Sequence, residues 1–448
     1  MNEQQWRQER DDRTIRYAAR RLNPDRCIAI TASFPYIWRY DGQIAILTAA
    51  NLLSRMSPSI ILAFPDVPVH SALPWAGRSL HEIILSQMRA ADPYGRFQAR
   101  SFQASDYRFH LGPNGNNFVI HGLGWNAYLG PSPSPLLDID DGNPFGAAFA
   151  VIVAVSQVFV HDFETPNDPF LANTLTWEHD QASSAPALSQ DHLGNIWVVG
   201  AGSVGTAALY FLSLITRRFS AVLIDMDRIK RQNLDRSPIF TDNDVGRYKV
   251  EATRDFLQDI GISNVQTEIC ALHESELWSG RPAGTPDLLI AAANEQNVRY
   301  HVEAQYPPIQ LYGTTGGSWQ ASLIRHIPGI EPCSCCLFPD EISHAALACG
   351  SASVQSDFNG TEQIDAALPF LSFAAGLMTA TEIFKLSLPG YPFNINRVFL
   401  YTRPHPRLVP ARISRDKNCI CGKRSNQLHQ KMLKGSKYEH LTTTPIPV

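Results

Sequence analysis

The feature that most constrains this 448-residue chain is an apolar strand pattern that runs directly into a glycine-rich turn. The run from Ile196 to Val199 leads into Gly200, Gly202 and Gly205, and a helical pattern follows. In such a unit the first glycine permits the tight turn, and the second lets a phosphate approach the backbone. The third lets the helix pack against the strand. The pattern predicts an α/β fold with a mostly parallel sheet.

A carboxylate and three polar residues follow this turn. Asp225 ends the next apolar run, AVLID, about twenty residues past the glycines, where a carboxylate accepts hydrogen bonds from ribose hydroxyls. The turn and Asp225 alone fit a nicotinamide dinucleotide as well as ATP. Asn233, Arg236 and Lys249 lie in a short loop-rich segment, where nicotinamide enzymes have an ordinary helix. Cations there suit a triphosphate, so the segment favours ATP.

These residues resemble the ThiF/MoeB superfamily, which includes the ubiquitin-activating enzymes. The family's D-x-D, N-L-x-R and D-V-G-x-x-K correspond to DMD, NLDR and DVGRYK in this chain. The resemblance implies that Asp225 holds the ribose, with Asp227 beside it at the nucleotide. It also implies that Asn233, Arg236 and Lys249 orient the phosphates of ATP for attack at the α-phosphorus.

Internal repetition predicts two related α/β halves. The segment NPFGAAFAVIVAVSQVFV from Asn143 aligns without gaps to LPFLSFAAGLMTATEIFK from Leu368. Earlier, CIAITAS, DGQIAILTAANLLSRM and SIILAFPD echo the loop, helix and strand that end at Asp225. By resemblance to the fused ubiquitin-activating enzymes, we expect two tandem Rossmann-like adenylation domains that form a pseudo-dimer within one chain. The expected parts are an inactive domain at 1–190, an active domain at 191–422 and a tail at 423–448.

The family also places an arginine of the N-terminal helix at the ATP phosphates of the active domain. DDRTIRY resembles the family's Y-x-R-Q motif, with Arg13 in the arginine's place and with Asp11 and Thr14 as departures. The resemblance therefore assigns Arg13 to the nucleotide site. Because the segment carries several other arginines, a solvated basic helix face is the alternative.

Two tight cysteine pairs predict a metal site. Cys333 and Cys336 form CxxC, and Cys419 and Cys421 lie in NCICG. Four thiolates can hold a structural zinc ion tetrahedrally. The family has a second CxxC where this chain has CxC, which leaves Cys335 as a substitute ligand. Buried free thiols are the other interpretation.

The resemblance supplies a nucleophile and a magnesium site. Cys349 lies in a segment that resembles the family's crossover segment, whose cysteine takes an acyl group from the adenylate as a thioester. Cys335 is the second candidate. Asn294 stands where the family has an aspartate that supports magnesium, and its amide oxygen can coordinate the ion with help from Glu295. Arg299 keeps the arginine of that pattern.

Charge and hydropathy exclude several classes of partner. A net charge of −4 with no long basic run argues against nucleic acid and anionic membranes. The charged N-terminus does not resemble a signal peptide, and the longest apolar helix pattern, Ala147 to Phe159, is too short to span a bilayer. Clustered rather than spaced cysteines are typical of a cytoplasmic protein.

Together these features predict ATP-dependent adenylation of the glycine-tailed C-terminus of a ubiquitin-like protein, followed by transfer through Cys349 to a conjugating enzyme. The fused pseudo-domain, the zinc pairs and the short segment after Cys421 resemble the activating enzymes of bacterial ubiquitin-like conjugation operons linked to phage defence. The nearest alternative is an adenylyltransferase for a sulfur-carrier protein or a small peptide. A nicotinamide-dependent oxidoreductase and an inactive scaffold, suggested by Asn294, are the others.

Overall fold

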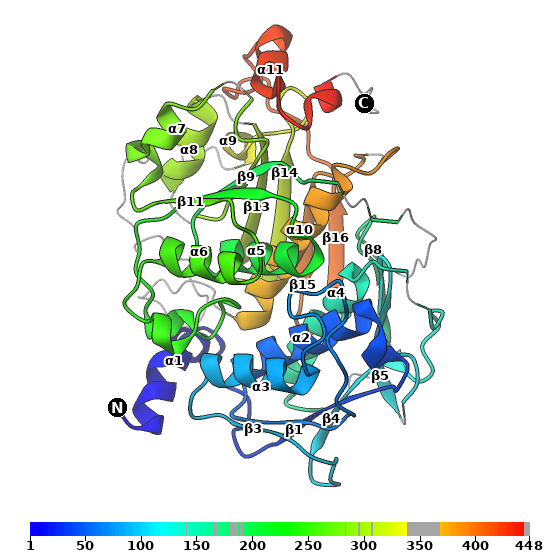
Figure 1. Ribbon diagram of the computed structural model, residues 1–448. Helices are drawn as coiled ribbons and strands as arrows, with labels where there is room; N and C mark the ends of the chain where they lie inside the picture. Colours follow the sequence, from blue (N-terminus) through cyan, green and yellow to red (C-terminus); the bar gives the residue numbers. More distant parts are fainter. Residues whose placement is uncertain are drawn as a thin grey trace.

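Two eight-stranded sheets, each flanked by helices, make up the computed structural model of the chain, and several helices lie between the sheets (Figure 1). The fold is therefore α/β, as the sequence predicts. The structure describes residues 1–115, 117–139, 141–164, 168–179, 187–188, 191–282, 284–293, 296–305, 308–337, 368–391 and 393–442.

The first sheet has the strand order β3-β2-β1-β4-β5-β6-β7-β8. The strands from β3 to β5 are parallel, and β6, β7 and β8 are added antiparallel. The strands are β1 (Ile28–Ala32), β2 (Ser59–Leu62), β3 (Arg96–Ala99), β4 (Tyr107–Leu111), β5 (Phe118–Leu123), β6 (Asn126–Pro131), β7 (Phe170–Asn173) and β8 (Glu178–His179). The helices of this half are α1 (Glu3–Ala18), α2 (Tyr40–Ser54), α3 (Leu80–Ala91) and α4 (Phe145–His161), with a 3₁₀ turn η1 (Tyr36–Trp38).

The second sheet repeats this order as β11-β10-β9-β12-β13-β14-β15-β16. Its strands are β9 (Asn195–Val199), β10 (Ser220–Ile224), β11 (Val265–Glu268), β12 (Leu288–Ala291), β13 (Ile309–Gly316), β14 (Gln320–His326), β15 (Arg397–Tyr401) and β16 (Arg407–Ala411). Its helices are α5 (Ser203–Ile215), α6 (Lys249–Asp259), α7 (Glu276–Ser279), α8 (Gln296–Ala304), α9 (Ser334–Leu337), α10 (Pro369–Lys385) and α11 (Asn426–Leu433). Short 3₁₀ turns are η2 (Arg231–Asn233), η3 (Asp242–Asp244), η4 (Leu272–Glu274) and η6 (Glu439–Thr442).

Equal strand order confirms the predicted repeat of two α/β halves. The aligned segments form α4 and α10, which pack against each other between the sheets. Phe145 contacts Phe384 with ring centroids 5.4 Å apart, and Phe159 contacts Phe370 at 5.6 Å. Because Phe145 aligns with Phe370 and Phe159 with Phe384, each contact is the counterpart of the other in the opposite half.

The two central helices are largely apolar, and protein covers them on every side. All residues of α10 are buried, and so is α4 from Phe145 to Phe159. α10 packs against α5, α4, β13 and β14. No helix in the described ranges combines the length and the apolarity that crossing a membrane requires.

The chain beyond the last strand folds back onto the second half. Within the described part of the predicted tail, the backbone N–H of Lys437 donates to Asp287, and the Tyr438 hydroxyl donates to the Leu193 carbonyl at 3.0 Å. Tyr438 is fully buried. The segment from Asn426 to residue 442 is thus part of the packed structure.

Candidate nucleotide-binding site

The glycine turn follows β9, at the point where the strand order of the second sheet reverses between β10 and β12. Ligands of open α/β sheets bind at such a point, beyond the carboxyl ends of the strands. Gly200 has a φ of +94°, and a Cβ there would lie 2.5 Å from the Ala293 nitrogen. A Cβ on Gly205 would lie 2.2 Å from the Gly200 carbonyl oxygen. Both positions therefore need glycine for the fold itself.

Gly202 differs from the other two glycines. A Cβ at this position would meet no heavy atom of the described residues within 4 Å, apart from its chain neighbours. Gly202 is also the N-cap of α5. Because glycine has no side chain, this residue cannot cap the first N–H groups of the helix. The open space at Gly202 and the start of a helix at this point together suit an anionic group such as a phosphate.

Asp225 is fixed beside this turn. One carboxylate oxygen accepts the Ala201 N–H at 2.8 Å, and the other accepts the Asp227 N–H at 2.8 Å. Burial raises the pKa of Asp225, and the neighbouring Lys249 opposes that rise. Lys249 donates to Asp227 at 2.6 Å, and its Nζ lies 3.9 Å from an Asp225 oxygen. The structure thus brings Asp225, Asp227 and Lys249 together at the glycine turn.

Asn233 and Arg236 lie in the segment that includes η2. The Asn233 side-chain oxygen accepts the Lys230 N–H at 2.8 Å and closes this turn. Arg236 is 5% exposed, and its Nη1 donates to the Gln232 carbonyl and to Asp235 at 2.5 and 2.8 Å. The neighbouring Ser237 shares a hydrogen bond of 2.6 Å with Thr206 of α5. This bond attaches the segment to the helix that begins at the glycine turn.

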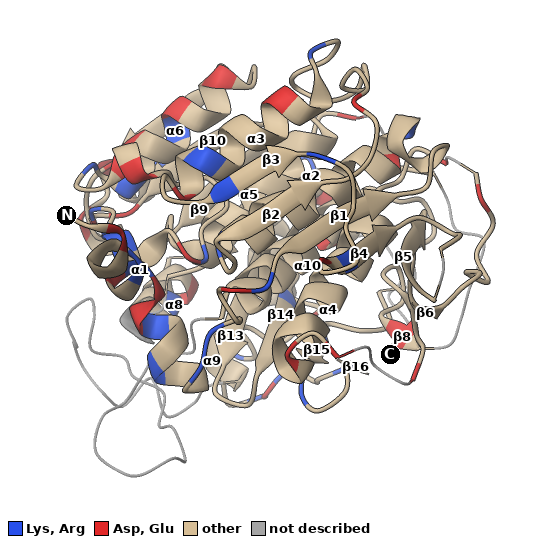
Figure 2. Ribbon diagram, turned by 90° about the horizontal axis from the view of Figure 1, so that it is seen from below, with Lys and Arg blue, Asp and Glu red and all other residues tan. Residues whose placement is uncertain are grey.

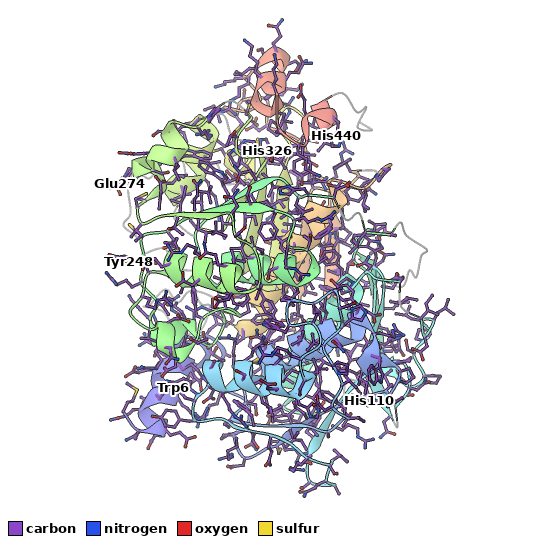
Figure 3. All side chains as sticks on the ribbon, viewed as in Figure 1. Trp6, His110, Tyr248, Glu274, His326 and His440 are labelled. Carbon is purple, nitrogen blue, oxygen red and sulfur yellow. The ribbon has the colours of Figure 1, made fainter. Side chains whose placement is uncertain are left out.

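The N-terminal helix α1 of the first half packs against this segment of the second half. Trp6 donates to Asp242 at 2.7 Å, and Arg231 donates to Glu9 at 2.8 Å (Figure 3 labels Trp6). Thr14 donates to Asp235 at 3.0 Å. Arg13 is half-buried and precedes Thr14 on this helix. The structure therefore places the helix that carries Arg13 against the segment that carries Asn233 and Arg236.

The arginines of α1 do not form a solvated face as a group. Arg7 and Arg10 are buried, and both donate to the buried carboxylate of Asp92, at 2.5 and 2.8 Å. Basic and acidic residues are interspersed along α1 (Figure 2). The basic residues of this helix therefore serve partly in internal ion pairs.

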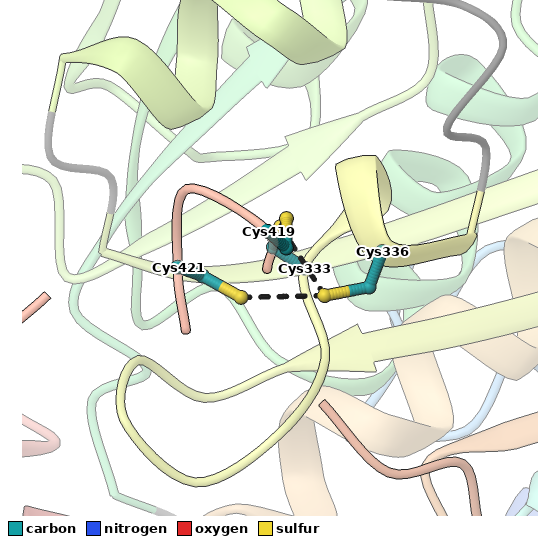
Figure 4. A group of neighbouring side chains, drawn as sticks. All are labelled: Cys333, Cys336, Cys419 and Cys421. Atoms are coloured by element: carbon teal, nitrogen blue, oxygen red, sulfur yellow. Dashed lines mark hydrogen bonds between the residues drawn. The ribbon is translucent and has the colours of Figure 1, made fainter. Parts of the chain in front are cut away.

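Four cysteines converge from two segments that are far apart in the chain (Figure 4). The sulfur atoms of Cys333, Cys336, Cys419 and Cys421 lie within 4.8 Å of one another. Cys333 and Cys419 are 3.5 Å apart, and Cys336 and Cys421 are 3.3 Å apart. A tetrahedral zinc site separates its sulfurs by about 3.8 Å, so the donor set fits zinc after small adjustments. Cys335 is buried outside this group.

Three of the predicted site residues lie outside the described part of the chain, namely Asn294, Glu295 and Cys349. Arg299 lies on α8.

Sequence reasoning missed the bonds that join the elements of the site. The Thr14–Asp235 bond joins residues 221 positions apart, and the Ala201–Asp225 bond joins residues 24 positions apart. One signal was present, because Trp6, Arg10 and Thr14 recur at four-residue spacing on α1 and are all buried.

We expect Gly205→Ala and Gly202→Ser to differ in stability. Gly205→Ala forces a Cβ against a backbone oxygen and should lower the free energy of unfolding by roughly 1–3 kcal/mol. Gly202→Ser enters open space at an N-cap, where serine is favoured, and should be neutral or slightly stabilising. Urea denaturation of both variants measures the difference. Equal losses would contradict the assigned packing of the turn.

We expect one thiolate-bound metal ion per chain. Cobalt(II) added to the metal-free protein should give an intense thiolate-to-metal charge-transfer band, and Cys333→Ser and Cys421→Ser should each abolish it. Cys335→Ser serves as the matched control and should keep the band. Loss of the band in the Cys335 variant would instead put this cysteine in the ligand set.

Comparison with known proteins gives several similarities. The SAMP-activating enzyme E1 of Haloferax volcanii is 25% identical over 198 residues, which cover 43% of this chain and 66% of that enzyme. The adenylyltransferase and sulfurtransferase MOCS3 of Culex quinquefasciatus is 26% identical over 174 residues, which cover 37% of this chain but only 38% of that protein. Among solved structures, Escherichia coli MccB with AMPCPP and MccA matches at a TM-score of 0.38 and 18% identity, covering 50% of this chain and 66% of MccB.

The family comparison covers more of the chain than these pairwise matches. The sequence profile of the ThiF family matches residues 183–422, which is more than half of the chain and includes the glycine turn, Lys249 and all four clustered cysteines. This chain belongs to the ThiF family.

Proposed function

We propose that this protein activates the C-terminal carboxylate of a ubiquitin-like protein by adenylation with ATP, and then stores the acyl group as a thioester on Cys349. The observation that carries the proposal is the meeting of the glycine turn, Asp225 and Lys249 at the carboxyl ends of parallel strands, with open space at Gly202. Membership of the ThiF family supports adenylation, since proteins similar to this chain are named as an activating enzyme and as adenylyltransferases.

In the proposed complex, Asp225 and Asp227 accept hydrogen bonds from the ribose hydroxyls, and the phosphates extend over Gly202 toward the start of α5. Lys249 is held by Asp227 at 2.6 Å, and a triphosphate offers its ammonium a stronger anionic partner than one exposed carboxylate. Arg236 and Asn233 approach the phosphates from the η2 segment. Arg13 adds a cation from the first half.

The reaction then proceeds in two steps. A carboxylate oxygen of the ubiquitin-like protein attacks the α-phosphorus, the bond to the bridging oxygen breaks, and pyrophosphate leaves. Positioning and charge neutralisation by Lys249, Arg236 and Arg13 supply most of the catalysis. The amide oxygen of Asn294, together with Glu295, would hold Mg²⁺, which supplies further neutralisation of the phosphates. The thiolate of Cys349 then attacks the acyl carbon, a thioester forms and AMP leaves.

We assign the parts of the chain accordingly. Residues 1–190 form an inactive domain that completes the site with α1, as a second subunit does in a dimer. Residues 191–422 form the active domain, in which a zinc ion held by the four cysteines ties the segment after β16 to α9. Residues 423–448 are a C-terminal tail. A conjugating enzyme receives the acyl group, and the setting is the cytoplasm of a bacterium that carries a phage-defence conjugation operon.

The adenylation step is tested by ATP–pyrophosphate exchange in the presence of a ubiquitin-like protein with a free C-terminal glycine. Lys249→Ala should lower the exchange rate roughly a hundredfold, because it removes a cation that stabilises the transition state. Lys431→Ala, an exposed lysine on α11, is the matched control and should exchange at the normal rate. Equal activity of both variants would remove Lys249 from the mechanism.

The thioester step has a separate test. After incubation with ATP and the ubiquitin-like protein, a non-reducing gel should show an adduct that thiols release and that Cys349→Ala abolishes. Cys335→Ala should keep the adduct. Loss of the adduct only in the Cys335 variant would move the nucleophile to that residue.

A second candidate function shares the first step only. The name of the Culex relative, an adenylyltransferase and sulfurtransferase, favours adenylation of a sulfur-carrier protein in which the adenylate passes directly to a sulfur donor. Exchange without any adduct would favour this function over thioester formation.

A further inference from the structure

Asp235 is a buried carboxylate at the contact between the two halves. It occupies the variable position of NLDR, and only 1% of its surface is exposed. One carboxylate oxygen accepts Nη1 of Arg236 at 2.8 Å, and the other accepts the Thr14 hydroxyl of α1 at 3.0 Å. Each oxygen is therefore bound by a different half of the chain.

The backbone around Asp235 is held by other groups. Arg55, at the end of α2, donates to the carbonyls of Leu234, Pro238 and Phe240 at 2.5, 2.9 and 3.2 Å. These bonds fix the path of the segment independently of the Asp235 side chain. The Asp235 carboxylate therefore does not have to hold the backbone. It contacts the guanidinium of Arg236 and the hydroxyl of Thr14, and it can orient both groups.

A buried carboxylate in this position is costly unless charges and hydrogen bonds compensate. Arg236 beside it, Arg10 from α1 and Arg55 from α2 supply positive charge, while Asp11 of α1 opposes them. This arrangement gives the guanidinium of Arg236 a defined direction. Its Nη1 already donates to the Gln232 carbonyl and to Asp235 before any ligand binds.

We propose that Asp235 is a positioning residue that orients Arg236 toward the nucleotide phosphates. Because Thr14 of α1 donates to the same carboxylate, this orientation also depends on the first half. The proposal rests on the proposed function. It explains why an acidic residue lies next to a cation assigned to an anionic ligand: the carboxylate binds one edge of the guanidinium and leaves its other donors for phosphate.

The test compares two ligands of the full-length protein. Asp235→Asn should weaken ATP binding roughly tenfold, because a charge-assisted bond to Arg236 becomes a neutral one. Thr14→Val should weaken it roughly threefold, and Thr14→Ser should restore it. Adenosine, which lacks phosphates, should bind all variants with the affinity of the wild type. Equilibrium dialysis with each ligand gives the affinities.

Asp242→Asn is the matched control. Asp242 also joins the halves, through Trp6 at 2.7 Å, but has no bond to Arg236 in the described structure. Its variant should bind ATP normally. The double variant Thr14→Val/Asp235→Asn should be no weaker than Asp235→Asn alone, because both changes act through the same carboxylate.

A pH series adds a readout that loss of packing would not give. Burial raises the pKa of Asp235 to about 6, against the opposing effect of Arg236. The carboxylate is charged above that pH and loses its charge below it. The ratio of wild-type to Asp235→Asn affinity for ATP should therefore fall toward one below about pH 6, and the titration of ATP itself cancels in this ratio.

The outcomes separate the two proposals. Wild-type protein that binds no ATP would overturn the proposed function and this inference with it. Wild-type protein that binds ATP, with an Asp235→Asn variant that binds both ligands normally or weakens both alike, would overturn only the positioning role.

Discussion

The packing of α4 against α10 is the contact on which the rest of the structure depends. Both helices are largely apolar and are buried on every side, so neither half can leave its own helix facing water. The crossed pairs Phe145–Phe384 and Phe159–Phe370 bury both ends of the contact, and burial of each aromatic side chain contributes roughly 1.5–3 kcal/mol. Because this contact fixes the halves relative to each other, it also brings α1 to the second half.

The same topology has been adapted differently in each half. After β9, the glycine turn leaves open space at Gly202. After β1, the corresponding loop contains Tyr36, which is fully buried, and the N-cap of α2 is Arg39, whose guanidinium pairs with Asp41 and Asp138. Protein atoms thus fill the place where the second half leaves room for a ligand. This difference supports the proposal that the nucleotide binds to the second half.

The boundary between the halves is apolar at its centre and polar at the candidate site. Along α1, buried arginines pair with Asp92, and Thr14 bonds to Asp235. Such bonds stabilise modestly compared with the central helices, but they are directional. They therefore give the contact between α1 and the second half a defined geometry, while the apolar contacts hold the two halves together.

The sequence by itself determined the α/β class, the repeated order of elements, the glycine turn and the acidic residues after β10, because each depends on neighbours in the chain and on periodicity. Only the tertiary structure decided which residues meet across large separations. Thr14 and Asp235 are 221 positions apart, and Cys333 and Cys419 are 86 apart. No local pattern encodes such pairs, since the packing of whole helices and sheets fixes them. For that reason the sequence left Cys335 open as a ligand and assigned Asp235 no role.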